Sequence, residues 1–463
     1  MKAHPDLEQD LAALCRELRD TCEYLEIRVE ESVSADLSFQ GRDLESLNRR
    51  SELGGNVRAL VRGAWGFTTF NSLEDVGERA RAAVAQARLA GGGPVVLAPV
   101  APVVDRVPLV AVRDPTEIGL DEKVERMRRL DAIVLGFGSP ITTSSAYYGD
   151  RRARIWMATS EGTALYQERM DASGGVVAIA NREGSVQRRG YSSGSSADPS
   201  LPDLTDEEVE RICRECADLT RAPKPRAGDY TVVISPRLAG VFAHEAIGHL
   251  SESDHVSENP KLREVMEIGR RLGNPDLDVY DTGLVAGSRG ALRYDEEGVP
   301  AARTDLISKG VLVGRLHSRE TAGMMGESAT GSARAINYRH PPIVRMRSTF
   351  IGPGRHALAE MFNGIDNGLY CVDSLGGQTN GEMFTFSAGY ARRIENGEPG
   401  DLLRDVSLAG NTFKTMLDIE MIEDRLGTSN EAGGGCGKAG QAPLPVGFGA
   451  PHLRIREVRI GGD

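Results

Sequence analysis

Residues 230–254 read YTVVISPRLAGVFAHEAIGHLSESD and carry the densest structural and chemical signals in the chain. The run at 231–235, rich in β-branched residues, predicts a short strand. Pro236 follows directly, and we expect a helix to begin there because proline is favoured at the first helical position. The segment therefore predicts a strand followed by a helix, and that helix carries the string HEAIGH at 244–249.

Two histidines flank a glutamate in this helix. In common zinc peptidases the histidines are four residues apart, so both imidazoles leave one helical face and the glutamate acts as general base. Here His244 and His249 are five apart, and a regular α-helix would turn the second side chain about 140° from the first. Gly248 tolerates a π-bulge or a helix end, either of which would return His249 toward His244. Metal binding therefore predicts a local break; ordinary core or surface histidines are the alternative.

A catalytic zinc site needs a third protein ligand and keeps one position open for water. Glu252, Asp254 and His255 are nearby candidates. A distant candidate is Cys436, which lies in the Gly-rich segment EAGGGCGKAGQ at 431–441. The glycines let the backbone approach closely, and a thiolate is a good soft ligand for zinc. The alternative for Cys436 is an exposed loop thiol, so the residues alone leave the third ligand open.

The other cysteines indicate a reduced protein, because six cysteines in 463 residues do not make a disulfide framework. Cys213 and Cys216 form a C-x-x-C within a helical stretch and have no second pair, which favours buried helix cysteines over a metal or redox site. The N-terminus has a charged helical pattern unlike a signal peptide, and the apolar run at 94–104 is short and broken by prolines. We therefore expect a cytoplasmic protein without a membrane span.

The charge balance argues against a nucleic-acid partner. The chain has 55 Lys and Arg residues against 67 Asp and Glu, a net charge of −12, and its basic residues form no long run. A phosphate backbone would require a basic patch or stripe. The length of 463 residues suggests about three domains, or two large ones.

The part of the chain before residue 220 predicts both helices and an antiparallel sheet. Hydrophobic periodicity and capping signals predict helices over 6–23, from 72–75 to 89, over 115–135 and over 205–219, and strands around 25–29, 35–50 and 56–70. Five strand-and-turn units about ten residues apart, between 141 and 190, predict an antiparallel meander. RAPKPRAGD at 221–229 has the composition of a linker.

After this linker the chain is rich in glycine and in short β-prone runs. The predicted fold class is therefore α+β. Residues 1–220 form an N-terminal domain with an antiparallel sheet and helices, and residues 230–463 form a mainly β domain that carries the metal-site helix. Within the second domain, GGQTNG at 376–381 is either a hairpin turn or a strand that pairs with a bound peptide.

Several motifs, taken together, resemble the TldD/PmbA family, also called modulator of DNA gyrase. The resemblance covers the chain from about residue 20 to 463. The motifs are GAWGFTTFNSLEDVGERARAAVAQA at 63–87, HEAIGH at 244–249, RYDEEGVP at 293–300, GVLVGRLHSRETAGMMGESATGSAR at 310–334 and GGGCGKAGQAPLPVGFGAPHLRI at 433–455.

The resemblance implies a metal site and an assembly. Metal-bearing members of the family hold zinc with the two histidines and a C-terminal cysteine, which correspond here to His244, His249 and Cys436. The glutamate of the motif, Glu245, is then the catalytic base. The family also implies a dimer, either a homodimer or a heterodimer with a metal-free paralogue of the PmbA or TldE type, which encloses a cavity for peptides.

The resulting hypothesis is a zinc-dependent peptidase that hydrolyses unfolded or extended peptides with a zinc-activated water and Glu245 as general base. One alternative is a specialised biosynthetic hydrolase of a peptide or amide. The other is a peptide-binding scaffold without catalysis. The presence of Glu245 argues against the scaffold, because zinc binding alone gives this residue no structural role.

Overall fold

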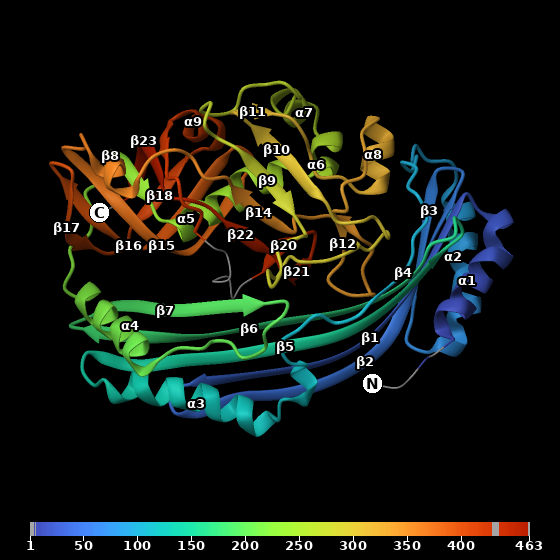
Figure 1. Ribbon diagram of the computed structural model, residues 1–463, viewed down its shortest axis with the longest axis horizontal. Helices are drawn as coiled ribbons and strands as arrows, with labels where there is room; N and C mark the ends of the chain where they lie inside the picture. The colour runs from blue at the N-terminus through green and yellow to red at the C-terminus, as the bar shows by residue number, and fades with distance from the viewer. Residues whose placement is uncertain (1–3, 5, 428–434, 462–463) are drawn as a thin grey trace.

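The computed structural model describes residue 4, residues 6–427 and residues 435–461. The chain forms two halves, each built on sheets, that face each other (Figure 1). The N-terminal half is a long curved sheet with helices along its outer side and at one end, and the C-terminal half lies over its inner side. This architecture confirms the predicted α+β class.

The N-terminal sheet has the strand order β3-β2-β1-β5-β6-β4, and β7 also pairs with β6. β4 is parallel to the start of β6, whereas β7 is antiparallel to the rest of it. The strands are β1 (Tyr24–Gln40), β2 (Asp43–Val61), β3 (Ala64–Phe70), β4 (Val104–Val107), β5 (Ile141–Thr159), β6 (Ala164–Arg182) and β7 (Ser185–Ser195). No strand among the described residues pairs with the other edge of β7, so this edge is open toward the C-terminal half.

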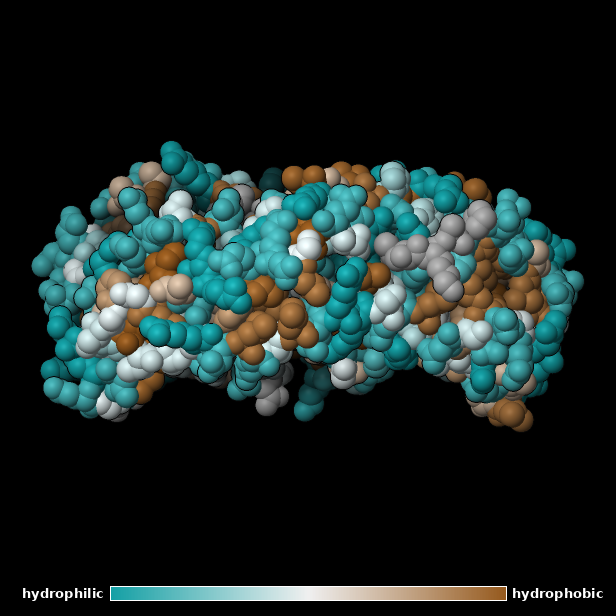
Figure 2. Space-filling view, turned by 90° about the horizontal axis from the view of Figure 1, so that it is seen from below, coloured by the Kyte–Doolittle hydropathy of each residue, from teal (hydrophilic) through white to brown (hydrophobic). Residues whose placement is uncertain are grey.

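Four helices cover this sheet through two apolar clusters. They are α1 (Leu7–Leu18), α2 (Val76–Ala90), α3 (Leu120–Gly136) and α4 (Asp206–Leu219). α1 and α2 pack at one end, and α3 and α4 pack along the outer side. Thr205 and Glu208 form the predicted capping box of α4. The view from below shows mostly hydrophilic residues, interrupted by separate apolar areas (Figure 2).

The predicted strand boundaries in this half were partly wrong. The prediction of a strand over 35–50 crossed a real turn, because β1 ends at Gln40 and β2 begins at Asp43. The five predicted units between 141 and 190 are three strands, two of which have 19 residues each. Gly175 does not mark a turn: a Cβ there would lie 2.7 Å from the carbonyl oxygen of Tyr191 on the neighbouring strand. The glycine allows two strands to approach closely.

The C-terminal half contains a closed circuit of strand pairings, β15-β8-β23-β18-β16-β15. A second sheet, β11-β10-β9-β14-β22, packs beside it in one shared apolar core. The strands are β8 (Gly228–Ile234), β9 (Val279–Thr282), β10 (Arg303–Ser308), β11 (Val311–Leu312), β12 (Ala333–Arg334), β13 (Ile343–Val344), β14 (Ser348–Ile351), β15 (Asn367–Asn380), β16 (Met383–Glu395), β17 (Glu398–Leu403), β18 (Ser407–Asn411), β19 (Ile419–Ile422), β20 (Cys436–Lys438), β21 (Gln441–Leu444), β22 (Gly447–Gly449) and β23 (Leu453–Gly461). The helices are α5 (Pro236–Phe242), α6 (Ser253–Glu258), α7 (Pro260–Val265), α8 (Arg319–Met325) and α9 (Thr412–Leu417).

Buried ion pairs join the two halves. Arg58 of the N-terminal sheet lies 3.2 Å from both Glu26 and Glu297, and all three side chains are almost fully buried. A second pair across the halves is only half buried: the buried Arg319 of α8 lies 2.7 Å from the exposed Glu161. Removing one partner of a buried pair leaves a charge without compensation, so such pairs fix the relative placement of the elements that carry them. The open edge of β7 is thereby held opposite the C-terminal half.

The segment 221–229 connects the halves, and we expect trypsin to cut it early after Arg226. Arg226 is exposed, whereas Lys224 precedes a proline and resists trypsin. The preceding carbonyl groups of Ala222 and Pro223 accept hydrogen bonds from Arg404, whereas the carbonyl of Arg226 accepts a solvent-exposed hydrogen bond from the hydroxyl of Tyr230, which can exchange for a protease more easily. Mass spectrometry of early fragments checks this. Resistance of the segment, with first cuts beyond residue 240, would contradict the division into 1–220 and 230–463, which stays a prediction.

None of the helices in the described part of the chain has the length and apolar character needed to cross a membrane.

Candidate metal centre

The metal-site helix changes its winding at the histidine motif. α5 ends at Phe242, and Ala243–Gly248 form a π-helical turn in which the backbone N–H of His249 donates to the carbonyl of His244. This hydrogen bond joins residues five apart, so His244 and His249 are separated by about one turn of the π-helix and their side chains lie on the same side. The two imidazole rings lie 5.2 Å apart between centroids, at 82° to each other. The predicted break in the helix is confirmed.

Close packing accounts for Gly248 in this turn. A Cβ at Gly248 would lie 1.9 Å from Sδ of Met346, a fully buried side chain. On the other side, Oγ1 of Thr379 in β15 donates a 3.2 Å hydrogen bond to the carbonyl of Glu245. A π-turn leaves carbonyl groups poorly paired within the helix, and this bond satisfies one of them. The turn is therefore held by β15 on one side and by the segment between β13 and β14 on the other.

Cys436 lies beside the two histidines. Its Sγ is 3.3 Å from Nε2 of His249, and one ligand atom of each of His244, His249 and Cys436 lies within 4.8 Å of the others. A nitrogen and a sulfur bound to one tetrahedral zinc are about 3.6 Å apart, given the usual bond lengths. Cys436 is buried rather than an exposed loop thiol. Residues 431–434 of its Gly-rich segment lie outside the described residues.

The donor set fits zinc. Two imidazoles and one thiolate are ligands that zinc accepts in catalytic sites. Nδ1 of His244 is buried and has no hydrogen-bond partner among the described residues. A buried polar atom without a partner is costly, and its presence here indicates a site built for a further group.

The electrostatics around Cys436 favour its thiolate. Burial alone would raise the pKa of Cys436, but hydrogen bonds from His244 and His249 outweigh burial and lower this pKa to about 5. The thiolate is the form that binds metals. At neutral pH the sulfur therefore needs little free energy of deprotonation before it can bind a metal.

Glu252 orients His249 and was not recognised in this role from the sequence, which offered it as a ligand. Its Oε2 lies 3.0 Å from Nδ1 of His249 and 3.0 Å from Nζ of Lys438. Burial would raise the pKa of this fully buried carboxyl, but His249 and Lys438 lower it to about 2. Burial would likewise lower the pKa of His249, but Glu252 and Cys436 raise it to about 10. A carboxylate on one ring nitrogen directs the other nitrogen toward the metal position.

The other nearby candidates do not join the histidines. Asp254 pairs with Lys438 at 2.7 Å, and His255 is exposed. Together with Glu252 they form a second group of possible ligands, but Nζ of Lys438 lies between the two carboxylates. Cys213 and Cys216 are buried in α4 within the apolar cluster under the N-terminal sheet, as predicted.

We expect Glu252→Gln to raise the zinc dissociation constant roughly 10- to 100-fold, the usual effect of losing the partner of a ligand histidine. Glutamine can still hydrogen-bond Nδ1 but lacks the charge that attracts the imidazole proton. A competition titration with a chromogenic chelator measures the constant. Glu258→Gln, an exposed residue of α6, is the matched control. Zinc binding as tight as that of the wild type would show that Glu252 does not position His249.

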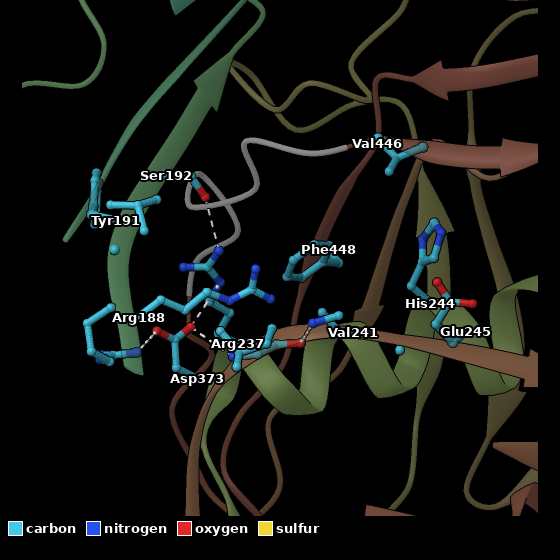
Figure 3. A pocket seen from close by; sticks show the side chains of 18 of the residues that line it. Arg188, Tyr191, Ser192, Arg237, Val241, His244, Glu245, Asp373, Val446 and Phe448 are labelled. Carbon is cyan, nitrogen blue, oxygen red and sulfur yellow. Dashed lines mark hydrogen bonds and ion pairs between the residues drawn. The ribbon is translucent and has the colours of Figure 1, made fainter. Parts of the chain in front are cut away.

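Of the three grouped side chains, His244 lines a cavity of about 470 Å³ that lies between the two halves. His244 and Glu245 lie at one end of it, and Arg237 lies near the other end (Figure 3). One wall comes from β7 at residues 188–192, and the opposite wall comes from β15 at residues 373–377. The carboxylate next to the histidines therefore faces a space large enough for several residues of a peptide.

Comparisons with known proteins identify a metallopeptidase family. Family models of the PmbA/TldA metallopeptidase match domain 1 at residues 25–90, the central domain at 113–222 and the C-terminal domain at 227–462. A metalloprotease of Synechocystis sp. is 42% identical over 98% of both chains. A zinc metalloprotease TldD homolog of Saccharolobus solfataricus is 31% identical over 78% of this chain and 82% of its own.

The fold is also similar to that of a solved structure. The crystal structure of TldE from Thermococcus kodakarensis matches with a TM-score of 0.78 and 18% identity, and the match covers 98% of this chain and all of that one. This identity is low, so it supports the fold alone. The family models and the full-length relatives carry the assignment: the chain belongs to the TldD/PmbA family of metallopeptidases.

Proposed function

We propose that this protein is a zinc-dependent peptidase that hydrolyses unfolded or extended peptides, with Glu245 as general base. The observation that carries the proposal is the convergence of His244, His249 and Cys436 beside a carboxylate that lines a cavity. A scaffold that only binds peptides would have no use for a carboxylate at this position.

His244, His249 and Cys436 would hold the zinc ion, which when bound would supply Lewis acidity toward the carbonyl of the bond to be cut and toward a water molecule. Glu245 accepts the proton of the attacking water and then delivers it to the leaving amine. The π-turn presents Glu245 to the cavity, while Thr379 holds its backbone carbonyl. Glu252 keeps Nε2 of His249 directed at the metal position.

Two open strand edges support an extended substrate. β15 pairs with β8 only through residues 368–371, so on this side residues 373–377 line the cavity without a strand partner in the described part of the chain. The N–H groups of Asp373, Ser374 and Gly376 already donate to side chains, so a peptide would pair here mainly through the remaining main-chain groups. The edge of β7 at 188–192 faces residues 373–377. An extended peptide can add to such an edge through main-chain hydrogen bonds, which depend little on sequence. The sequence allowed GGQTNG at 376–381 to be a hairpin turn or a strand that pairs with a peptide. In the structure, residues 376–380 belong to β15 and the turn begins at Gly381.

The test is hydrolysis of a set of unstructured peptides by zinc-loaded protein, followed by mass spectrometry.

We also propose that the protein works as a dimer, either with itself or with a metal-free paralogue. The assay therefore includes both assemblies, and light scattering reports their mass. Cleavage at many unrelated sequences supports a general peptidase. Cleavage of a single modified peptide or amide would favour the specialised hydrolase instead, and no cleavage by either assembly would contradict the proposal.

A further inference from the structure

The cavity has a cationic end that the proposed chemistry does not use. The three arginines that line it, Arg188, Arg189 and Arg237, come from β7 and α5, and the carboxylate among the lining residues at this end is Asp373. Asp373 is shared: its Oδ2 lies 2.7 Å from Arg189 and its Oδ1 lies 3.2 Å from Arg237. Arg189 also pairs with Glu215 at 2.9 Å. Arg188 is exposed to the cavity and has no ion-pair partner among the described residues. This end therefore carries a net positive charge.

Arg237 still has donors for a ligand. Its Nε faces Asp373 and its Nη2 donates a 3.0 Å hydrogen bond to Oγ of Ser192. These contacts with described residues hold the guanidinium in place and leave the N–H groups of Nη1 for an acceptor in the cavity. The side chain is 21% exposed, so it is partly desolvated but accessible. A fixed planar guanidinium of this kind binds carboxylates better than a mobile ammonium group does.

The distance between Arg237 and the metal centre sets a position in the substrate. Arg237 and His244 are seven residues apart on one helical segment, so their backbone positions are about 10 Å apart along the helix axis. An extended peptide advances about 3.3 Å per residue, so about three residues span this distance. Val241 and Phe448 lie between the two ends in Figure 3, which gives the intervening stretch an apolar surface.

A second cavity of about 450 Å³ continues beyond Arg237 and shares Arg237, Asp373 and Phe448 with the first. Beyond the shared residues, its charged lining consists of the acidic Asp203, Glu208 and Glu215 and the basic Arg211, which pairs with Glu215 at 3.0 Å. A peptide that continues past Arg237 therefore meets acidic side chains. The preference for negative charge is confined to one substrate position and is not a general attraction for acidic peptides.

We propose that Arg237 selects peptides that carry a carboxylate about three residues from the bond that is cut; this inference rests on the proposed peptidase function. The carboxylate is either an Asp or Glu side chain or the C-terminal carboxylate of the peptide. Space beyond Arg237 admits a chain that continues, and a peptide that ends there fits as well.

The test uses zinc-loaded full-length protein in its active assembly and peptides in which a single Gln→Glu change is moved along the sequence. We expect kcat/KM for Glu over Gln to rise roughly 10- to 100-fold at one position two to four residues from the cut bond, the range for a hydrogen bond to a charged group. Arg237→Leu brings this ratio close to 1, and Arg237→Lys, which keeps the charge, gives an intermediate ratio. Arg81→Leu, which removes an exposed arginine of α2, is the control and keeps the wild-type ratio.

Two further arms complete the experiment. Peptides with a free C-terminal carboxylate are compared with their amides, which separates a terminal carboxylate from a side chain; either source supports the proposal. Fluorescence anisotropy with zinc-loaded Glu245→Gln protein measures binding of the same Glu and Gln peptides without hydrolysis. If the wild type cuts peptides but its kcat/KM ratio for Glu over Gln peptides is near 1, the inference is overturned and the peptidase function is upheld. The same holds if Arg237→Leu keeps the wild-type kcat/KM ratio. A wild type that cuts no peptide contradicts the peptidase, and the anisotropy ratio then decides the role of Arg237 alone.

Discussion

Glu245→Gln is expected to lower peptide hydrolysis by roughly 10²- to 10⁴-fold, the usual contribution of general acid–base catalysis. Glutamine has nearly the same size and can hydrogen-bond water, but it cannot accept the proton. Glu245 is partly exposed to the cavity and is not one of the three grouped ligand residues, so the fold and the zinc content should survive. Initial rates with one unstructured peptide, at equal zinc content, measure the effect.

Glu258→Gln is the matched control for Glu245→Gln, because it makes the same chemical change on the exposed side of α6. It should hydrolyse the peptide at the wild-type rate. A Glu245→Gln protein that is zinc-loaded and still cuts at the wild-type rate would remove Glu245 from the mechanism. A variant that loses zinc would show instead that Glu245 supports the metal site.

Cys436→Ser is expected to weaken zinc binding by more than the roughly 10- to 100-fold that follows from losing the partner of a ligand. Serine replaces a thiolate whose pKa is already lowered to about 5 with a hydroxyl that stays protonated and is a poor ligand for zinc. Elemental analysis after dialysis gives the zinc content per chain. Cys213→Ser, which changes a thiol in the core of the N-terminal half, should keep its zinc. Full occupancy in Cys436→Ser would remove Cys436 from the ligands and contradict the proposed donor set.

Local signals predicted the four helices of the N-terminal half and the helix at Pro236 well, but they missed the short helices α6 to α9 and gave the strands less well. The capping box at Thr205 and Glu208 and the proline at 236 mark helix ends through contacts within a few residues, and both helices are present. Strand length depends instead on partners far along the chain. β5 and β6 pair along almost their whole length, so glycines and aspartates that signal turns in isolation lie within continuous strands.

The candidate site was also predictable where it depends on neighbouring residues and less so where it depends on residues far apart in the chain. The five-residue spacing of the histidines together with Gly248 was enough to predict a change in helical winding. Cys436 was one of several candidates until the family motifs were considered, because 187 residues separate it from His249. The position of Glu252 three residues after His249 was visible, but its choice between ligand and hydrogen-bond partner depends on Lys438 and on burial. The cavity could not be predicted, because its walls come from two strands whose facing edges are set by interfaces between the halves.

The most direct test of the central claim is a zinc titration of chelator-treated protein while hydrolysis of an unstructured peptide is followed. If His244, His249 and Cys436 hold one catalytic zinc, chelation abolishes hydrolysis, and the rate returns in proportion to added zinc until one equivalent per chain is bound. Hydrolysis at the full rate by protein whose zinc has been removed would contradict the account.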